Sequence, residues 1–169
     1  MKNKGLSHIG LATCYLDRTH DFYENVLGFP AVRCDRYKII EGGDLRHIFF
    51  DTGQGQLIGF IESRGVAGIP ADFDAGITNA LGVPSLFYHF AFEAGSEAEL
   101  EAKRLTLTGK DVPVTEIVDH DWCKSFYFDD PNGIKLEYCC YTRPLNGDDA
   151  QMQLRLELPR QALGFTDHR

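Results

Sequence analysis

Two histidines of this chain have surroundings and spacings that suit a metal centre. His8 lies in the short apolar stretch LSHIGLA, and His89 lies in the similar stretch LFYHFAF. Each is followed by a helix-like segment, and each lies 20 residues before the glycine that ends this segment, Gly28 or Gly109. Equal spacing predicts that the two histidines occupy equivalent positions of an internal repeat.

A glutamate follows in the stretch from His120 to Glu137, HDWCKSFYFDDPNGIKLE. Apolar residues alternate around Tyr127 as in a half-buried strand, DPNG is a turn sequence, and a second alternating run carries Glu137. When the repeats are aligned, Glu137 lies opposite Gly59, so only the second repeat has a carboxylate there. Glu62 lies three residues beyond Gly59, and this odd offset turns its side chain to the other strand face.

His8, His89 and Glu137 would together provide two imidazoles and one carboxylate. This donor set leaves coordination positions open and suits non-haem Fe(II), where a substrate and O₂ need adjacent sites. A Zn²⁺ or Ni²⁺ Lewis-acid site would add another side chain, such as Glu62 through a strand bulge. A strand histidine is more often structural than a ligand, so a chance arrangement stays an alternative.

The order of predicted elements is βαβββ, repeated once. We therefore expect an α+β fold in which two tandem βαβββ modules form an open metal-binding β-barrel. The expected domains are a first module at 1–62, a linker at 63–85, a second module at 86–142 and a C-terminal tail at 143–169.

Capping and periodicity predict the helices. One helix is expected from Asp17 to Leu27, and a second from a capping box of Ser96 and Glu99 to about Leu107. The tail contains one alternating run, at 152–158, which fits a strand or a helix.

Composition restricts the partners. The 169 residues carry a formal charge of -8 with a pI near 5.2, which argues against nucleic acid or an anionic membrane as a partner. Transmembrane and signal segments are not expected, so the predicted location is the cytoplasm. The five cysteines lack C-x-x-C spacing and are expected to be reduced, packed thiols.

These motifs resemble the vicinal oxygen chelate superfamily, which includes glyoxalase I, bleomycin- and fosfomycin-resistance proteins and extradiol dioxygenases. The resemblance covers about residues 5–142 and rests on LSHI before a helix with DFYENVLGF, on His89, and on DDPNG leading to Glu137. It implies that His8, His89 and Glu137 bind the metal. It also implies a homodimer, as in much of the superfamily.

The stretch that ends at Glu137 is most similar to the extradiol dioxygenase signature. This similarity implies that His120 and Tyr127 hydrogen-bond the substrate and oxygen. It further implies Fe(II), with Zn, Ni or Mn possible, and cleavage of an aromatic vicinal diol by O₂. Those enzymes carry an acid-base histidine on the strand that here reads LIGFI, so His47 on the neighbouring strand is the available substitute.

Two other functions remain open. One is a glyoxalase I-type lyase or isomerase with Zn or Ni, for which Glu62 would be the fourth ligand. The other is a non-catalytic drug-binding resistance protein, whose acidic surface would suit a cationic ligand.

Overall fold

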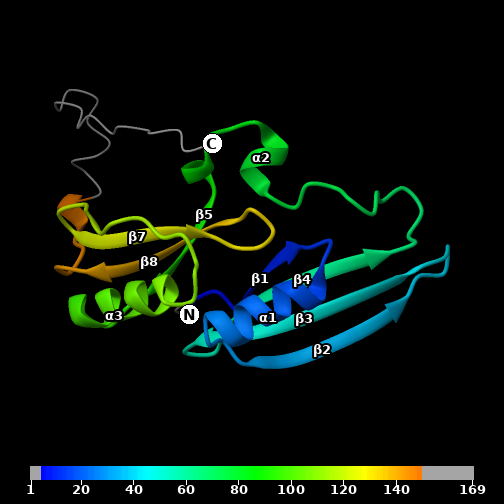
Figure 1. The fold of residues 1–169 in the computed structure, drawn as a ribbon, viewed down its shortest axis with the longest axis horizontal. Coiled ribbons are helices and arrows are strands. Elements are labelled where there is room, and N and C mark those ends of the chain that lie inside the picture. The colour runs from blue at the N-terminus through cyan, green and yellow to red at the C-terminus, as the bar shows by residue number, and fades with distance from the viewer. Residues whose placement is uncertain (1–4, 150–169) are drawn as a thin grey trace.

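The first module has the predicted order of elements. The structure, a computed structural model, describes residues 5–149 (Figure 1). The elements are β1 (His8–Ala12), α1 (Leu16–Asp21), the π-helical turn η1 (Phe22–Val26), β2 (Ala31–Lys38), β3 (Asp44–Gly53) and β4 (Gln56–Arg64).

The second module repeats this order after a linker that is itself partly helical. The linker contains α2 (Ile77–Leu81) and the 3₁₀ turn η2 (Ser85–Phe87). The module consists of β5 (His89–Glu93), α3 (Glu97–Thr108), β6 (Val118–Asp119), β7 (Cys123–Asp129) and β8 (Lys135–Tyr141).

Each module forms one four-stranded sheet. The strand orders are β1-β4-β3-β2 and β5-β8-β7-β6. In each sheet the first strand pairs in parallel with the last, and the other pairs are antiparallel. The two histidine strands, β1 and β5, are therefore edge strands of their sheets.

The registers of the two sheets confirm the internal repeat. Gly59 pairs with Gly10 and Phe49. Glu137 pairs with Ala91 and Tyr127 in the same way. Because residues that pair across neighbouring strands point to the same side, Glu137 shares a sheet face with Tyr127.

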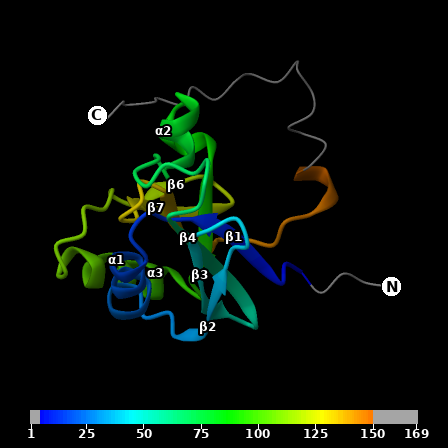
Figure 2. The same ribbon diagram turned by 90° about the vertical axis from the view of Figure 1, so that its right-hand side faces the viewer.

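One hydrophobic core serves both modules. Apolar side chains from one face of each sheet join those of the helices, and Phe29 packs edge-on against Phe92 with ring centroids 4.8 Å apart. Figure 2 shows α1 and α3 close together beside the sheets. The opposite face of each sheet, which carries the histidines of β1 and β5, points away from this core.

The α+β class and the two βαβββ modules are confirmed. Within residues 5–149 the sheets do not pair with each other, so this part of one chain does not close a barrel. The expected helix at 17–27 divides into α1 and η1, where Leu27 donates to the carbonyl of Phe22, five residues back. The second helix agrees well, because Ser96 accepts a hydrogen bond from the Glu99 amide.

Other expectations need adjustment. The linker at 63–85, which separates the two predicted modules, contains the short helix α2. The βαβββ order requires a strand between α3 and β7, but this part of the chain forms only a single bridge from Val114 to Phe128 and the short β6. The run at 152–158 lies outside the described residues.

Candidate functional site

His89 and Glu137 lie next to each other on the exposed face of the second sheet. The Nε2 atom of His89 is 3.1 Å from an Oε2 oxygen of Glu137. The His89 side chain is 38% exposed, whereas that of Glu137 is only 7% exposed. The other ring nitrogen of His89, Nδ1, is 2.8 Å from the carbonyl oxygen of Leu86.

This contact with a carbonyl fixes the hydrogen on the His89 ring. A carbonyl oxygen only accepts, so Nδ1 must carry the proton. In the neutral ring, Nε2 then directs a lone pair at the Glu137 carboxylate, and two such groups attract each other only through a cation or a proton between them.

Tyr127 and His120 form a second polar pair beside the first. The Nε2 atom of His120 is 2.9 Å from the Tyr127 hydroxyl, and the Tyr127 ring lies edge-on to His89 with centroids 6.2 Å apart. Burial, together with the negative charge of Glu137, raises the pKa of the Tyr127 hydroxyl well above its usual value. Tyr127 is therefore a neutral phenol at physiological pH and can donate a hydrogen bond.

A cavity of about 450 Å³ connects these residues. Its lining includes His89, Glu137, His120 and Tyr127, and the β3–β4 turn from Thr52 to Gln56 forms another part of the wall.

Sequence reasoning missed part of this lining. Glu93, Tyr141 and Trp122 also border the cavity. The alternation of β5 and β8 could have indicated Glu93 and Tyr141, because they share faces with His89 and Glu137. The sequence of the turn from Thr52 to Gln56 gave no comparable indication that the turn lines a cavity.

The cysteines of the cavity are poor candidates for metal ligands. Cys123 and Cys139 are both buried and both line the cavity. Burial raises the pKa of Cys123 and raises that of Cys139 to about 12. Because only the thiolate binds metal well, the donor set is imidazole and carboxylate.

His8 lies on the other sheet and is not one of the residues that line this cavity. Its Nδ1 is 3.0 Å from the Ser7 hydroxyl, and its ring lies edge-on to Phe49 at 5.7 Å. His47 lies on the same face, and its ring centroid is 4.1 Å from that of Phe49 with the two planes inclined by 42°. Burial lowers the pKa of His47, and its buried Nε2 atom makes no hydrogen bond among the described residues.

Glu62 points into the core face, as its offset predicts. Its side chain is 2% exposed and accepts hydrogen bonds from Arg46 and Arg64 at 2.6 and 2.8 Å. It also accepts from the backbone amide of Leu16 at 3.0 Å, which caps the start of α1. Glu62 is thus a structural residue of the first module.

The predicted ligands therefore lie in two places. Within residues 5–149 of one chain, no three histidine, cysteine, aspartate or glutamate side chains are grouped closely enough to hold a metal ion. The pair of His89 and Glu137 fits two ligand positions of a metal, and the assignment of His8 as the third stays a prediction. In the described part of the chain, no helix is long and apolar enough to cross a membrane.

Solved structures with this fold are varied in kind. An integron cassette protein from the mobile metagenome of the Halifax Harbour sewage outfall is 24% identical, with a TM-score of 0.58 over 82% of this chain and 99% of that one. Lactoylglutathione lyase from Agrobacterium tumefaciens is 23% identical, with a TM-score of 0.57 over 83% and 96% of the two chains. TnmS3, an antibiotic-binding protein from Streptomyces sp. CB03234, is 14% identical, with a TM-score of 0.58 over 84% and 99%.

No curated protein matches the sequence. A family match, however, covers residues 5–138, which is most of the chain and includes the histidine of each module and Glu137. The chain therefore belongs to the glyoxalase/bleomycin resistance protein/dioxygenase superfamily.

Proposed function

We propose that this protein is an Fe(II)-dependent extradiol-type dioxygenase that acts on an aromatic vicinal diol. The observation that carries the proposal is the pair of His89 and Glu137, because a ring nitrogen with a fixed lone pair faces a carboxylate oxygen at 3.1 Å. A metal cation between the two groups would satisfy this arrangement, and His and carboxylate ligands are those of non-haem iron sites with open positions.

His89 and Glu137, with His8, would hold the metal, which would supply binding of the diol and of O₂ at this end of the cavity. The protein residues would position the substrate. Tyr127, kept neutral by burial, would donate a hydrogen bond to a substrate oxygen, and His120 would orient the Tyr127 hydroxyl. Low exposure of Glu137 limits the access of water to this end of the cavity.

The third ligand, His8, is proposed to come from a second copy of the chain. His8 lies on the open face of the first sheet, and the His89–Glu137 pair lies on the open face of the second. If two copies pair the first sheet of one with the second sheet of the other, each of the two sites gains a histidine. We therefore propose a homodimer in which His47 accompanies His8 toward the cavity.

A lyase of the glyoxalase I type receives less support. Its fourth ligand would be Glu62, which is buried in the core face and bonded to two arginines. The register of β3 and β4 shifts only near Asp51 and Gly53, far from Glu62, so no bulge turns this side chain around.

Metal loading tests the proposal. Protein purified without oxygen should contain iron, and it should consume O₂ when 4-ethylcatechol is added. His8→Ala, His89→Ala or Glu137→Ala should each weaken iron binding by at least about 100-fold, since even indirect partners of ligands contribute about 10–100-fold. Glu62→Gln and His20→Ala, which change a buried structural acid and a surface histidine, should leave iron binding unchanged.

Other outcomes would identify the alternatives. Zinc or nickel together with turnover of a thiol adduct would support the lyase. A protein without any metal that binds a cationic drug tightly would support the resistance protein, and either result would contradict the dioxygenase.

A further inference from the structure

The cavity beside His89 and Glu137 continues toward a second, acidic end. Glu93 lies on the same face of β5 as His89, and its register partner on β8 is Cys139, two residues beyond Glu137. Because a strand rises about 3.3 Å per residue, Glu93 lies about 7 Å further along the sheet than Glu137.

Two aromatic rings border this acidic end. Trp122 and Tyr141 lie with ring centroids 5.7 Å apart and planes inclined by 40°. Both line the cavity, and they are 37% and 49% exposed. Rings of this kind attract a cation placed within about 6 Å of their faces.

Glu93 has no hydrogen-bonding or oppositely charged partner in the part of the chain that the structure describes. Its side chain makes no ion pair or hydrogen bond to any described residue, and no lysine or arginine lines the cavity. The lysine of β8 on this sheet face, Lys135, is paired with His89 rather than with Glu93, and it binds Asp129 at 2.7 Å. Among residues 5–149, therefore, no side chain supplies a positive charge to Glu93, and a cationic ligand would supply it.

The open face of the first sheet would not change this balance. Its arginine, Arg33, donates two hydrogen bonds to Asp35 at 2.6 and 2.8 Å. A second copy that brings His8 to the cavity would also bring Arg33, but the charge of Arg33 is already neutralised by Asp35.

We propose that Glu93, Trp122 and Tyr141 form a subsite for a positively charged amine on the substrate. This inference rests on the proposed function, because the diol end at His89 and Glu137 sets the distance. An aromatic ring that carries the diol and a two-carbon amine chain has about the length needed to reach Glu93. A carboxylate at the same position would be repelled by both glutamates.

Binding of two matched catechols tests the subsite. Dopamine and 4-ethylcatechol share the ring, the diol and the two-carbon chain, and they differ by the ammonium group. Titrations would be made without oxygen by calorimetry on the metal-containing protein. Quenching of Trp122, the single tryptophan of the chain, would report that the ligand occupies this cavity.

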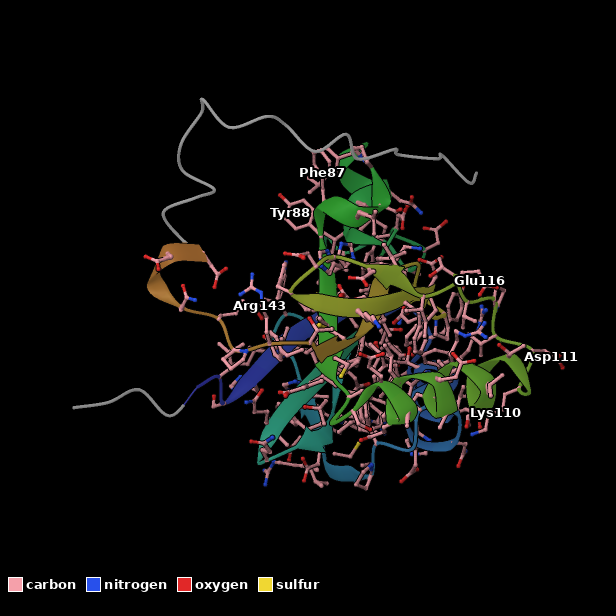
Figure 3. All side chains as sticks on the ribbon, turned by 90° about the vertical axis from the view of Figure 1, so that its left-hand side faces the viewer. Phe87, Tyr88, Lys110, Asp111, Glu116 and Arg143 are labelled. Atoms are coloured by element: carbon pink, nitrogen blue, oxygen red, sulfur yellow. The ribbon has the colours of Figure 1, made fainter. Side chains whose placement is uncertain are left out.

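Dopamine should bind at least about 10-fold more tightly than 4-ethylcatechol, and 3,4-dihydroxyphenylacetate should bind more weakly than both. Glu93→Gln should remove the preference for dopamine while the affinity for 4-ethylcatechol stays the same. Glu116→Gln is the matched control, because it removes the same charge from a side chain that is 91% exposed. Arg143 follows the cavity residue Tyr141 by two positions and marks this end of the cavity in Figure 3. Glu116 lies on the opposite side of the molecule from Arg143.

Equal affinity of the wild-type protein for dopamine and 4-ethylcatechol would overturn the subsite, and so would a preference that survives Glu93→Gln. The outcome is separate from that of the proposed function. If the preference depends on Glu93 but neither catechol supports O₂ uptake, the amine subsite stands and the dioxygenase fails.

Discussion

At position 59 the first module has a hydrogen where the second module has the Glu137 side chain. Neighbouring rings fill the space. A Cβ atom on Gly59 would lie 2.9 Å from two atoms of the Phe49 ring and 3.1 Å from Nε2 of His47. The Phe49 and His47 rings lie above the Cα atom of Gly59 and contact each other. In the first module, therefore, the rings of Phe49 and His47 occupy the space above Gly59 where the second module has a carboxylate.

Gly59→Ala should destabilise the protein by about 1–3 kcal/mol, because the new methyl group forces the Phe49 ring out of its packing. Gly10→Ala is the matched control. Gly10 pairs with Gly59 on the neighbouring strand, but a Cβ atom there would meet nothing within 4 Å. Chemical denaturation of both variants measures the difference, and equal stability of the two would contradict the proposed packing.

Glu62 is a buried acid that stabilises the first module. Burial alone would raise its pKa, but hydrogen bonds from Arg46, from the Leu16 amide and from Arg64 outweigh burial and lower the pKa from 4.5 to about 2. The folded state thus favours the charged form more than the unfolded state does. The resulting stability is complete above the unfolded pKa and is lost as the pH falls from about 4.5 to about 2.

Glu62→Gln should lower the free energy of unfolding at pH 7 by about 3 kcal/mol, because it leaves the Arg46 guanidinium without its buried partner. The variant should also lose less stability than the wild type between pH 4.5 and 2. Glu101→Gln is the control, since Glu101 pairs with Arg104 at the surface. A pH dependence that is the same in Glu62→Gln and in the wild type would refute this role.

At the scale of elements, the turn between β7 and β8 holds the two modules together. Asn132 in this turn contacts the hydroxyls of Thr13 at 2.7 Å and Thr19 at 3.2 Å. Tyr23 of η1 donates to the buried Asp130 carboxylate, which also accepts from the Ile134 amide. The same turn therefore docks on α1 and η1 and positions the start of β8, the strand that carries Glu137.

Asn132→Ala should destabilise the protein by about 1–3 kcal/mol, because the buried hydroxyls of Thr13 and Thr19 each lose their hydrogen bond to the turn and keep only their bonds within the first module. Asn25→Ala should change stability by less than about 0.5 kcal/mol, since Asn25 only bonds Asp21 at the helix surface. Thermal unfolding of both variants makes the comparison. If Asn132→Ala is as stable as the control, the turn does not join the modules in this way.

Much of each module could be predicted from its sequence. Alternation and turn residues gave the strands, and the equal offset of His8 and His89 gave the repeat, since a repeat fixes register within a module. The packing between modules depends on contacts such as that of Phe29 with Phe92, which no local pattern indicates. For this reason the separation of His8 from Glu137 within one chain was not anticipated.

Loop geometry was also beyond the sequence. Trp122 reaches the cavity because Asp121 takes a φ of 73°, and the Asp119 carboxylate accepts the Asp121 amide at 2.8 Å. Asp tolerates this conformation better than most residues, but its presence alone does not predict it. The Trp122 position therefore came from the structure and not from alternation along the strand.

At the scale of the whole molecule, apolar groups are exposed on the open faces of both sheets. Tyr37 and Ile61 on the first sheet are 49% and 38% exposed, and Val118 and Tyr141 on the second are 41% and 49% exposed. Tyr88, which directly precedes β5, is also 48% exposed, and Figure 3 shows it projecting outward. Exposed apolar surface of this extent is typical of a face that another chain covers.

The arrangement of the proposed dimer determines which pairs of variant chains can restore iron binding when they form a heterodimer. In a heterodimer of a His8→Ala chain and a Glu137→Ala chain, one site would combine both damaged residues. The other site would combine the intact His8 of one chain with the intact His89 and Glu137 of its partner. With different affinity tags on the two chains, the purified heterodimer should bind about half the iron of the wild-type dimer, although neither variant alone binds it.

A heterodimer of His89→Ala and Glu137→Ala chains is the matched control. His89 and Glu137 lie on one sheet of one chain, so each site of this heterodimer keeps one damaged residue and no iron binding should return. Restoration in both mixtures would mean that His89 and Glu137 also come from different chains, and restoration in neither would place His8 in the same chain as its partners. Only recovery confined to the first mixture agrees with a metal centre assembled between the first sheet of one copy and the second sheet of another.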